Sequence, residues 1–279
     1  MLGTRHEEYS HSQDGLPFRL YANLERTPHL LSDEQNWHDD LEIQLCVDGD
    51  GEVLLNGKAY PFSRGDVAVV NSNVIHYTGT DGHLTYTCLI VSTEFCRSVG
   101  IDCQTVTFSP LVKSDCLARL MSELTAIYRD SAMPLRVARL HEKLLELLIE
   151  LATHHAAQRV LPPIRDRAMK TVKNAIKYIR EGYGTKVTLD LVARAVYTDK
   201  YTLCRSFKRL TGQTMVEYIN RYRCQKAAEH MAGGLTVAEA ARLCGFENLS
   251  FFSKTFKRMT GYSPTTYRKM RKTAKAQAK

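Results

Sequence analysis

Long hydrophobic runs are absent from this sequence. The longest apolar stretch, residues 144–152, is interrupted by Glu146 and Glu150, whereas a membrane-spanning helix needs roughly 18 uninterrupted apolar residues. The first fifteen residues also lack a basic start followed by an apolar segment, which is the pattern of a secretory signal. We therefore expect a cytoplasmic protein with no membrane partner.

Paired cysteines are absent as well. The eight cysteines include no CxxC pair, the spacing typical of zinc sites and redox motifs. With 279 residues, of which 44% are hydrophobic and 24% charged, the chain is long enough to build about two domains without disulfides. We expect free thiols, mostly buried, and neither a metal cluster nor a disulfide framework.

Acidic residues are scarce in the second half of the chain. Residues 161–279 contain 25 Lys and Arg against 8 Asp and Glu, a net charge of +17, whereas residues 1–160 contain 13 against 22, a net charge of −9. The basic half suits a polyanion such as nucleic acid, although a membrane surface or an acidic partner would fit the charge alone. Adjacent prolines within residues 158–163 place a linker where the charge changes sign.

The acidic half begins with a strand pattern. Residues 37–91 show short apolar or alternating segments separated by turn signals such as DGDG, SRGD and NSN, which predicts an antiparallel barrel or sandwich. Alternation along residues 41–47 places side chains on opposite faces of one strand. The predicted apolar face holds Leu41, Ile43, Leu45 and Val47, and the partly polar face holds Glu42, Gln44 and Cys46.

Two helices are predicted within residues 109–157, because leucines recur there at helical spacing. The apolar stripe on the second helix is broad and has two alternative uses. It could pack back onto the barrel, or it could form a helix pair across a dimer interface. We assign this segment to dimerisation.

The basic half contains an internal repeat. Residues 203–212, LCRSFKRLTG, are echoed by residues 252–261, FSKTFKRMTG, at an offset of 49 residues. Each copy follows a short amphipathic helix, at residues 189–195 or 237–243, and a tight connection. Asp199 and Asn248 are predicted N-caps, and Gly212 and Gly261 suit the position past a helix end. This pattern predicts two helix-turn-helix units.

Basic residues concentrate on the second helix of each unit, with few acids nearby. A helical solenoid with a solvated basic face is the alternative, but such clustering favours insertion into the major groove with flanking phosphate contacts. Residues 170–268 resemble the AraC/XylS-type DNA-binding domain, and GFENLSFFSKTFKRMTGYSPTTYRK follows its signature. The resemblance implies a linker helix at about residues 216–231. Lys254 departs from it, because Arg is commoner there, which favours a phosphate contact over a bidentate guanine contact.

The resemblance also implies which residues bind DNA. The base-reading positions would be Tyr201, Cys204 and Arg205 in the first unit and Leu249, Ser250, Ser253 and Lys254 in the second. Lys200, Lys208 and Lys257 complete the predicted DNA-binding set. Leu203, Phe207, Phe252 and Phe256 are assigned to the core. A linker of about 16 residues spans roughly 24 Å, against about 34 Å between successive major grooves, so we expect two boxes about 10 base pairs apart.

The barrel resembles a cupin over residues 37–91. His38, Glu42 and His76 stand at three of the places where enzymatic cupins hold a metal, and Asn36 stands where the first histidine would be. We expect an organic effector pocket lined by His38, Glu42, Gln44 and His76. A metal site and a purely structural barrel remain alternatives.

Together these observations predict an α+β protein. A cupin-like sensor domain (residues 1–108) precedes a helical dimerisation segment (109–157), a linker (158–163) and a double helix-turn-helix domain (164–279). We expect a homodimeric, effector-responsive transcription regulator, an activator rather than a repressor and not an enzyme, with no cofactor and no metal. Its expected partners are promoter DNA, RNA polymerase and a small-molecule effector, for which a sugar is one candidate. The alternative is a metal-dependent cupin enzyme with a basic DNA-binding appendage.

Overall fold

A computed structural model describes residues 15–27, 36–103, 105–157 and 165–277. These residues form two compact units, one within residues 15–157 and the other within residues 165–277. The predicted linker, residues 158–163, lies outside the described residues. No helix in the described part of the chain is long and apolar enough to cross a membrane. A sheet-rich unit followed by a helical unit confirms the predicted α+β class.

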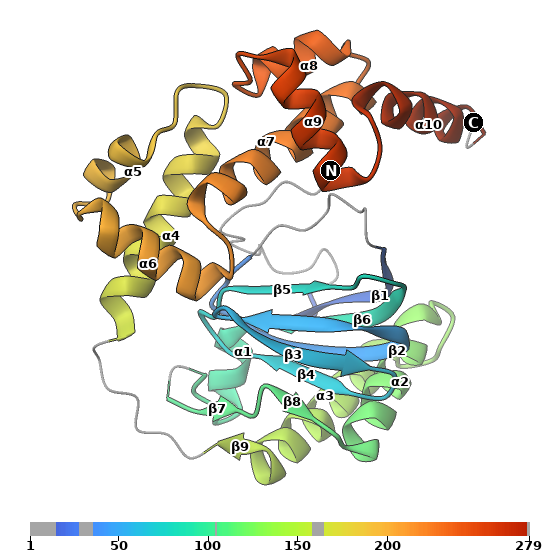
Figure 1. Cartoon of the computed structure of the whole chain (residues 1–279). Coiled ribbons are helices and arrows are strands. Elements are labelled where there is room, and N and C mark those ends of the chain that lie inside the picture. Colours follow the sequence, from blue (N-terminus) through green and yellow to red (C-terminus); the bar gives the residue numbers. More distant parts are fainter. Residues whose placement is uncertain (1–14, 28–35, 104, 158–164, 278–279) are drawn as a thin grey trace. The chain divides into compact units, whose positions relative to one another are not determined.

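The first unit is built on a seven-stranded antiparallel sheet (Figure 1). Its strands are β1 (Phe18–Arg26), β2 (Leu41–Leu55), β3 (Lys58–Ser63), β4 (Val67–Val70), β5 (His76–Gly79), β6 (Leu84–Val91) and β8 (Leu111–Val112). The first part of β2 pairs with β4 and β6, and its last part pairs with β3 and β5. This strand therefore belongs to both parts of the sheet, which folds over an interior. Strand β1 lies before residues 37–91, the region in which strands were predicted.

Two helices cover one face of the sheet (Figure 1). The helical and shorter elements of this unit are α1 (Thr93–Ser98), β7 (Thr107–Phe108), α2 (Asp115–Arg129), α3 (Arg136–His154) and β9 (Ala156–Ala157). Leu41, Ile43 and Leu45 join the leucines of α2 and α3 in one buried cluster. The even-numbered Cys46 instead belongs to a second cluster in the interior of the sheet. Both faces of β2 are thus buried here.

The expectation for Val47 was wrong. Its side chain is 37% exposed, although the alternation placed it on the apolar face. The pairing of β2 with β6 shifts register between Cys46 and Asp48, and such a bulge interrupts the alternation of side chains. The apolar face of this strand therefore ends at Leu45.

The eight cysteines are all described and all free, six of them buried and two half-buried. The prediction of free and mostly buried thiols is confirmed. The hydrophobic clusters of the two units include several of these thiols as ordinary packing groups, as expected for a small apolar side chain.

The second unit is helical. Its elements are α4 (Arg165–Gly182), α5 (Leu189–Ala195), α6 (Lys200–Thr211), α7 (Met215–Ala232), α8 (Val237–Leu243), α9 (Leu249–Thr260) and α10 (Pro264–Gln277). Helix α4 packs against α5 and α6, whereas α8, α9 and α10 pack against α7. Helices α5 and α8 have the bounds that the sequence predicts, and α7 extends the predicted linker helix by one residue at each end.

Within the helical unit, the repeated capping residues explain why the two helix-turn-helix units have the same local structure. Asp199 Oδ1 accepts a hydrogen bond from the backbone N–H of Thr202 at 2.9 Å, and Asn248 Oδ1 accepts one from Phe251 at 2.9 Å. Each cap satisfies an amide that the first helical turn leaves without a partner. Gly212 and Gly261 end α6 and α9 with φ values of 73° and 74°, a left-handed conformation that favours glycine. The two helix-turn-helix units are confirmed.

Candidate functional site

Four predicted effector-binding residues meet in the interior of the sheet-rich unit. His38 lies just before β2, and His76 begins β5. Glu42 and Gln44 alternate along β2. All four are at most 7% exposed. They therefore form one buried polar cluster, in which neither Glu42 nor Gln44 faces solvent.

The Glu42 carboxylate is the centre of this cluster. Its Oε2 atom lies 2.9 Å from His38 Nε2 and 3.2 Å from His76 Nε2. Its Oε1 atom accepts a hydrogen bond from Gln44 Nε2 at 2.6 Å and one from Cys88 Sγ at 3.2 Å. Four side chains from three strands and one loop thus converge on one carboxylate, which satisfies a group whose burial alone would be costly.

Sequence reasoning missed two members of the polar cluster. Cys88 lies on β6, and Thr78 on β5 donates a hydrogen bond to Gln44 Oε1 at 2.7 Å. These contacts join residues 46 and 34 positions apart in the chain. Only the pairing of β2 with β5 and β6 brings them together, and the residues themselves carry no local signal of that pairing.

Backbone carbonyl oxygens lie beside one nitrogen of each imidazole. His38 Nδ1 lies 3.0 Å from the carbonyl oxygen of Asp40, and His76 Nδ1 lies 3.0 Å from that of Val74. A carbonyl oxygen only accepts, so Nδ1 carries the proton on each ring. Nε2 can then donate to Glu42 only when the ring holds a second proton. This arrangement directs both Nε2 atoms toward the Glu42 carboxylate.

The electrostatics of Glu42 follow from this arrangement. Burial alone would raise the pKa of its carboxyl group. The positive charge of His76 and the hydrogen bonds from both imidazoles outweigh that effect and hold the pKa of Glu42 well below its ordinary value. Glu42 is therefore an anion at neutral pH in an interior that otherwise disfavours charge.

The donor set of the polar cluster also fits a metal ion. His38, Glu42 and His76 offer donor atoms that all lie within 4.8 Å of one another, and two imidazoles with a carboxylate suit a divalent transition metal. Asn36 forms a backbone bridge with His76, which places both side chains on one face of the pairing. Asn36 Oδ1 is buried without a hydrogen-bond partner. It is therefore an acceptor available to a bound group.

The predicted DNA-binding residues lie on two basic helices, α6 and α9. Neither helix contains an acidic residue. Eight of the predicted residues are exposed and two, Cys204 and Ser253, are half-buried. The exposed ones are Lys200, Tyr201, Arg205, Lys208, Leu249, Ser250, Lys254 and Lys257. Each helix therefore presents one polar, cationic face to solvent.

The opposite faces of α6 and α9 hold the residues assigned to the core. Leu203, Phe207, Phe252 and Phe256 are fully buried, so those assignments are confirmed. Lys200 differs from its cationic neighbours, because its Nζ atom lies 2.8 Å from Asp190 Oδ1 on α5. A phosphate would have to compete with this carboxylate, so Lys200 is the weakest phosphate-binding candidate on α6.

Acid should remove the contribution of Glu42 to stability. A carboxyl group whose pKa is lowered in the folded state stabilises the fold above its unfolded pKa, about 4.3. That contribution is lost as the pH falls through the lower folded pKa. We expect Glu42→Gln to unfold at lower urea concentration than the wild type at pH 7, and the difference to shrink below about pH 4. Urea titrations followed by circular dichroism in EDTA measure it.

The matched control is Glu142→Gln on α3, which removes an exposed carboxylate. We expect this variant to follow the wild type at every pH, because an exposed and solvated carboxylate adds little to stability. A difference between wild type and Glu42→Gln that stays constant from pH 7 to pH 3 would contradict the role given to the ionised carboxylate.

Each of the two compact units matches a known domain family. Residues 24–158 match the AraC-like ligand binding domain, and residues 192–270 match a helix-turn-helix domain. The uncharacterised HTH-type transcriptional regulator YdeC of Bacillus subtilis is 25% identical over 255 residues, covering 84% of this chain and 86% of YdeC. The HTH-type transcriptional activator RhaR of Escherichia coli is 22% identical over 246 residues, with coverage of 84% and 86%.

Among solved structures, ToxT from Vibrio cholerae is 15% identical, with a TM-score of 0.49, covering 91% of this chain and 98% of that chain. The two domain matches account for most of the chain, in the order ligand binding and then DNA binding. They agree with the sheet-rich first unit and with the duplicated helix-turn-helix of the second. The chain belongs to the AraC/XylS family and is a transcription regulator with a ligand-binding domain and a helix-turn-helix DNA-binding domain.

Proposed function

We propose that this regulator is an effector-responsive activator that binds promoter DNA as a homodimer and recruits RNA polymerase. The observation that carries the proposal is the pair of acid-free basic helices at equivalent places in two helix-turn-helix units. In each unit the second helix enters the major groove, and the flanking lysines bind phosphates. Selection of genomic DNA fragments by the purified protein at about 150 mM salt tests it, and enrichment of a paired-box motif is the expected result.

Arg205 is the residue we assign to base recognition in the first unit. It is exposed on α6, and its planar guanidinium can donate two parallel hydrogen bonds to the O6 and N7 atoms of guanine. Lys208, one turn further on, is a point charge suited to a phosphate. The two residues should therefore act differently on sequence preference.

Arg205→Ala should relax discrimination at one base pair of the selected motif. A bidentate contact contributes about 1–3 kcal/mol, so we expect roughly a 5- to 150-fold loss of preference at that position. Lys208→Ala, the control on the same helix, should weaken binding to all sequences equally and lower the salt dependence of affinity. Fluorescence anisotropy with single-base variants measures both. An unchanged preference at every base in Arg205→Ala would contradict the assignment.

The buried polar cluster is the proposed effector site. Its groups form hydrogen bonds with a polar organic molecule, and Asn36 Oδ1 offers an acceptor that no protein group uses. A hydroxyl-rich molecule such as a sugar fits this chemistry. A divalent metal ion is the second candidate, favoured by one observation. Both Nδ1 atoms are committed to backbone carbonyls, which directs the Nε2 atoms of His38 and His76 toward Glu42 as metal ligands.

Removing the polar cluster should abolish the response to the effector while leaving the DNA motif unchanged. We expect His38→Ala and Glu42→Ala to lose the thermal shift that the wild type shows with its ligand, and His83→Ala to retain it. His83 is the control because its side chain is exposed on the same unit. The screen covers sugars and Zn²⁺, Mn²⁺ and Fe²⁺, with metal content measured after purification. A ligand response that survives in both cluster variants would contradict the assignment.

An exposed stripe on α3 supports the proposed homodimer. Val137, Leu145 and Ile149 are spaced by eight and four residues and are 50%, 36% and 64% exposed. Residues at this spacing share one side of a helix. The buried leucines of α3 pack against the sheet and α2, so this stripe is a second apolar side of the same helix. Both uses predicted for the helix are therefore compatible.

Ile149→Glu should convert the dimer into monomers, because a charge at the centre of an apolar helix pair is desolvated without a partner. Val216→Glu on α7 is the control, since Val216 is 63% exposed in the other unit. Analytical ultracentrifugation at micromolar concentration measures the oligomeric state. A dimer that persists in Ile149→Glu would exclude this stripe as the interface.

A further inference from the structure

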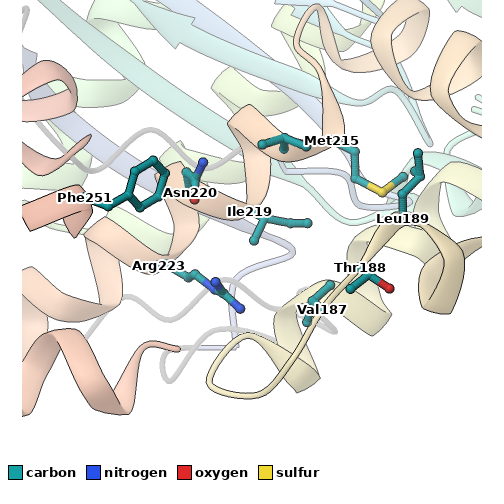
Figure 2. A pocket seen from close by; sticks show the side chains of 9 residues that line it. Val187, Thr188, Leu189, Met215, Ile219, Asn220, Arg223 and Phe251 are labelled. Atoms are coloured by element: carbon teal, nitrogen blue, oxygen red, sulfur yellow. The ribbon is translucent and has the colours of Figure 1, made fainter. Parts of the chain in front are cut away.

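The two helix-turn-helix units are separated along part of their boundary. A groove of about 300 Å³ lies between them on one side of α7. Figure 2 shows Val187, Thr188 and Leu189 from the first unit on one side of the groove and Phe251 from the second unit on the other. Side-chain packing across the groove therefore does not fix the distance between α6 and α9.

The units make direct backbone contact beside this groove. A Cβ atom on Gly184, in the loop between α4 and α5, would lie 2.7 Å from the carbonyl oxygen of Leu243 at the end of α8. A Cβ atom on Gly245, in the turn of the second unit, would lie 2.8 Å from the carbonyl oxygen of Tyr183. Real Cβ atoms do not approach so closely, so glycine at both positions permits the contact.

Arg223 on α7 joins these two segments. Its Nε atom donates to the carbonyl oxygen of Tyr183 at 2.9 Å, and an Nη atom donates to that of Thr185 at 2.8 Å. The other Nη atom donates to the carbonyl oxygen of Gly245 at 2.9 Å. One guanidinium thus binds two carbonyls of the first unit's loop and one carbonyl of the second unit's turn. Such charge-assisted hydrogen bonds are stronger than neutral ones.

The surroundings of Arg223 suit this task. Its guanidinium also lies 5.8 Å from the centre of the Phe246 ring, within the range of a cation–π contact. The three carbonyl groups are fixed by the backbone, so their positions do not depend on side-chain rotamers. Lysine could not replace this geometry, because an ammonium lacks the planar fork.

We propose that Arg223 is a positioning residue that holds the two recognition helices at one separation, and so determines the spacing between the two DNA boxes that the regulator accepts. The proposal rests on the proposed binding of both units to DNA. Arg223 has its guanidinium on protein carbonyls and contacts no base in this scheme. It acts on the distance between two recognition events, whereas Arg205 acts on the sequence of one.

The test uses the full chain and duplexes that carry the selected boxes at their natural spacing, with one base pair inserted, with one base pair deleted, and with one box replaced. One base pair displaces the second box by about 3.4 Å along the axis and rotates it around the helix, which a rigid protein does not follow. We expect the wild type to lose about fivefold or more in affinity in both altered spacings. Arg223→Gln should bind all three spacings within about twofold, and bind one-box DNA like the wild type.

Arg223→Lys should be intermediate, because its ammonium reaches fewer of the three carbonyls. Gly184→Ala tests the same contact without touching Arg223, since its methyl group would force the loop away from Leu243. It should also alter the spacing profile. Gly182→Ala is the matched control, because the nearest atoms to its Cβ would be at an ordinary 3.6 Å. If Arg223→Gln fails to fold, as judged by thermal unfolding, Gly184→Ala decides.

Each outcome has one meaning. A folded Arg223→Gln with the wild-type spacing profile overturns the proposal, as does a loss of one-box binding in that variant. A wild type that binds all spacings equally, or needs only one box, instead overturns the proposed use of both units. A flattened profile in Arg223→Gln and Gly184→Ala, with Gly182→Ala unchanged, supports the positioning role.

Discussion

Helix α7 belongs to two hydrophobic cores at once, and the arrangement of the DNA-binding unit depends on this shared membership. Tyr218 packs edge-on against Phe207 of the first helix-turn-helix unit, with ring centres 5.5 Å apart. Its hydroxyl accepts a hydrogen bond from Arg180 at 2.7 Å. Further along the helix, Cys224 and Met231 enter the cluster of the second unit. A helix that is buried on several sides cannot rotate to serve one core without disrupting the other. Both helix-turn-helix units are therefore anchored to the same helix, on which Arg223 also lies.

Local chemistry explains why the helical unit could be predicted closely from sequence. Asp199 and Asn248 begin α6 and α9, and Gly212 and Gly261 end them. These capping signals act over a few residues, so they can be recognised in the sequence without knowledge of the tertiary fold. The repeat places the same capping signals at equivalent positions in both copies, which supports the prediction of each unit. The burial of Phe207 and Phe256 follows from the same helical periodicity.

Long-range pairing explains why the sheet-rich unit could be predicted only in part. The resemblance to cupins identified Glu42 and its histidines, yet Thr78 and Cys88 reach the polar cluster only through strand pairings that the sequence does not display. The exposure of Val47 depends on a bulge set by its partner strand. The role of Arg223 was not predicted, for a different reason. Its partners are backbone carbonyl groups. Every residue type has such a group, so the sequence does not indicate which ones Arg223 contacts.

The alternation along β2 gives the polar cluster a consequence for folding. Leu41, Ile43 and Leu45 face the helices, while Glu42 and Gln44 face the interior. A slip of one residue would exchange the two sets. Glu42 would then lie among leucines without its imidazole partners, at a cost of several kcal/mol. The carboxylate and its hydrogen-bond partners thus specify the register of β2, because a shifted register would bury the charge without those partners. This constraint acts before any ligand is bound.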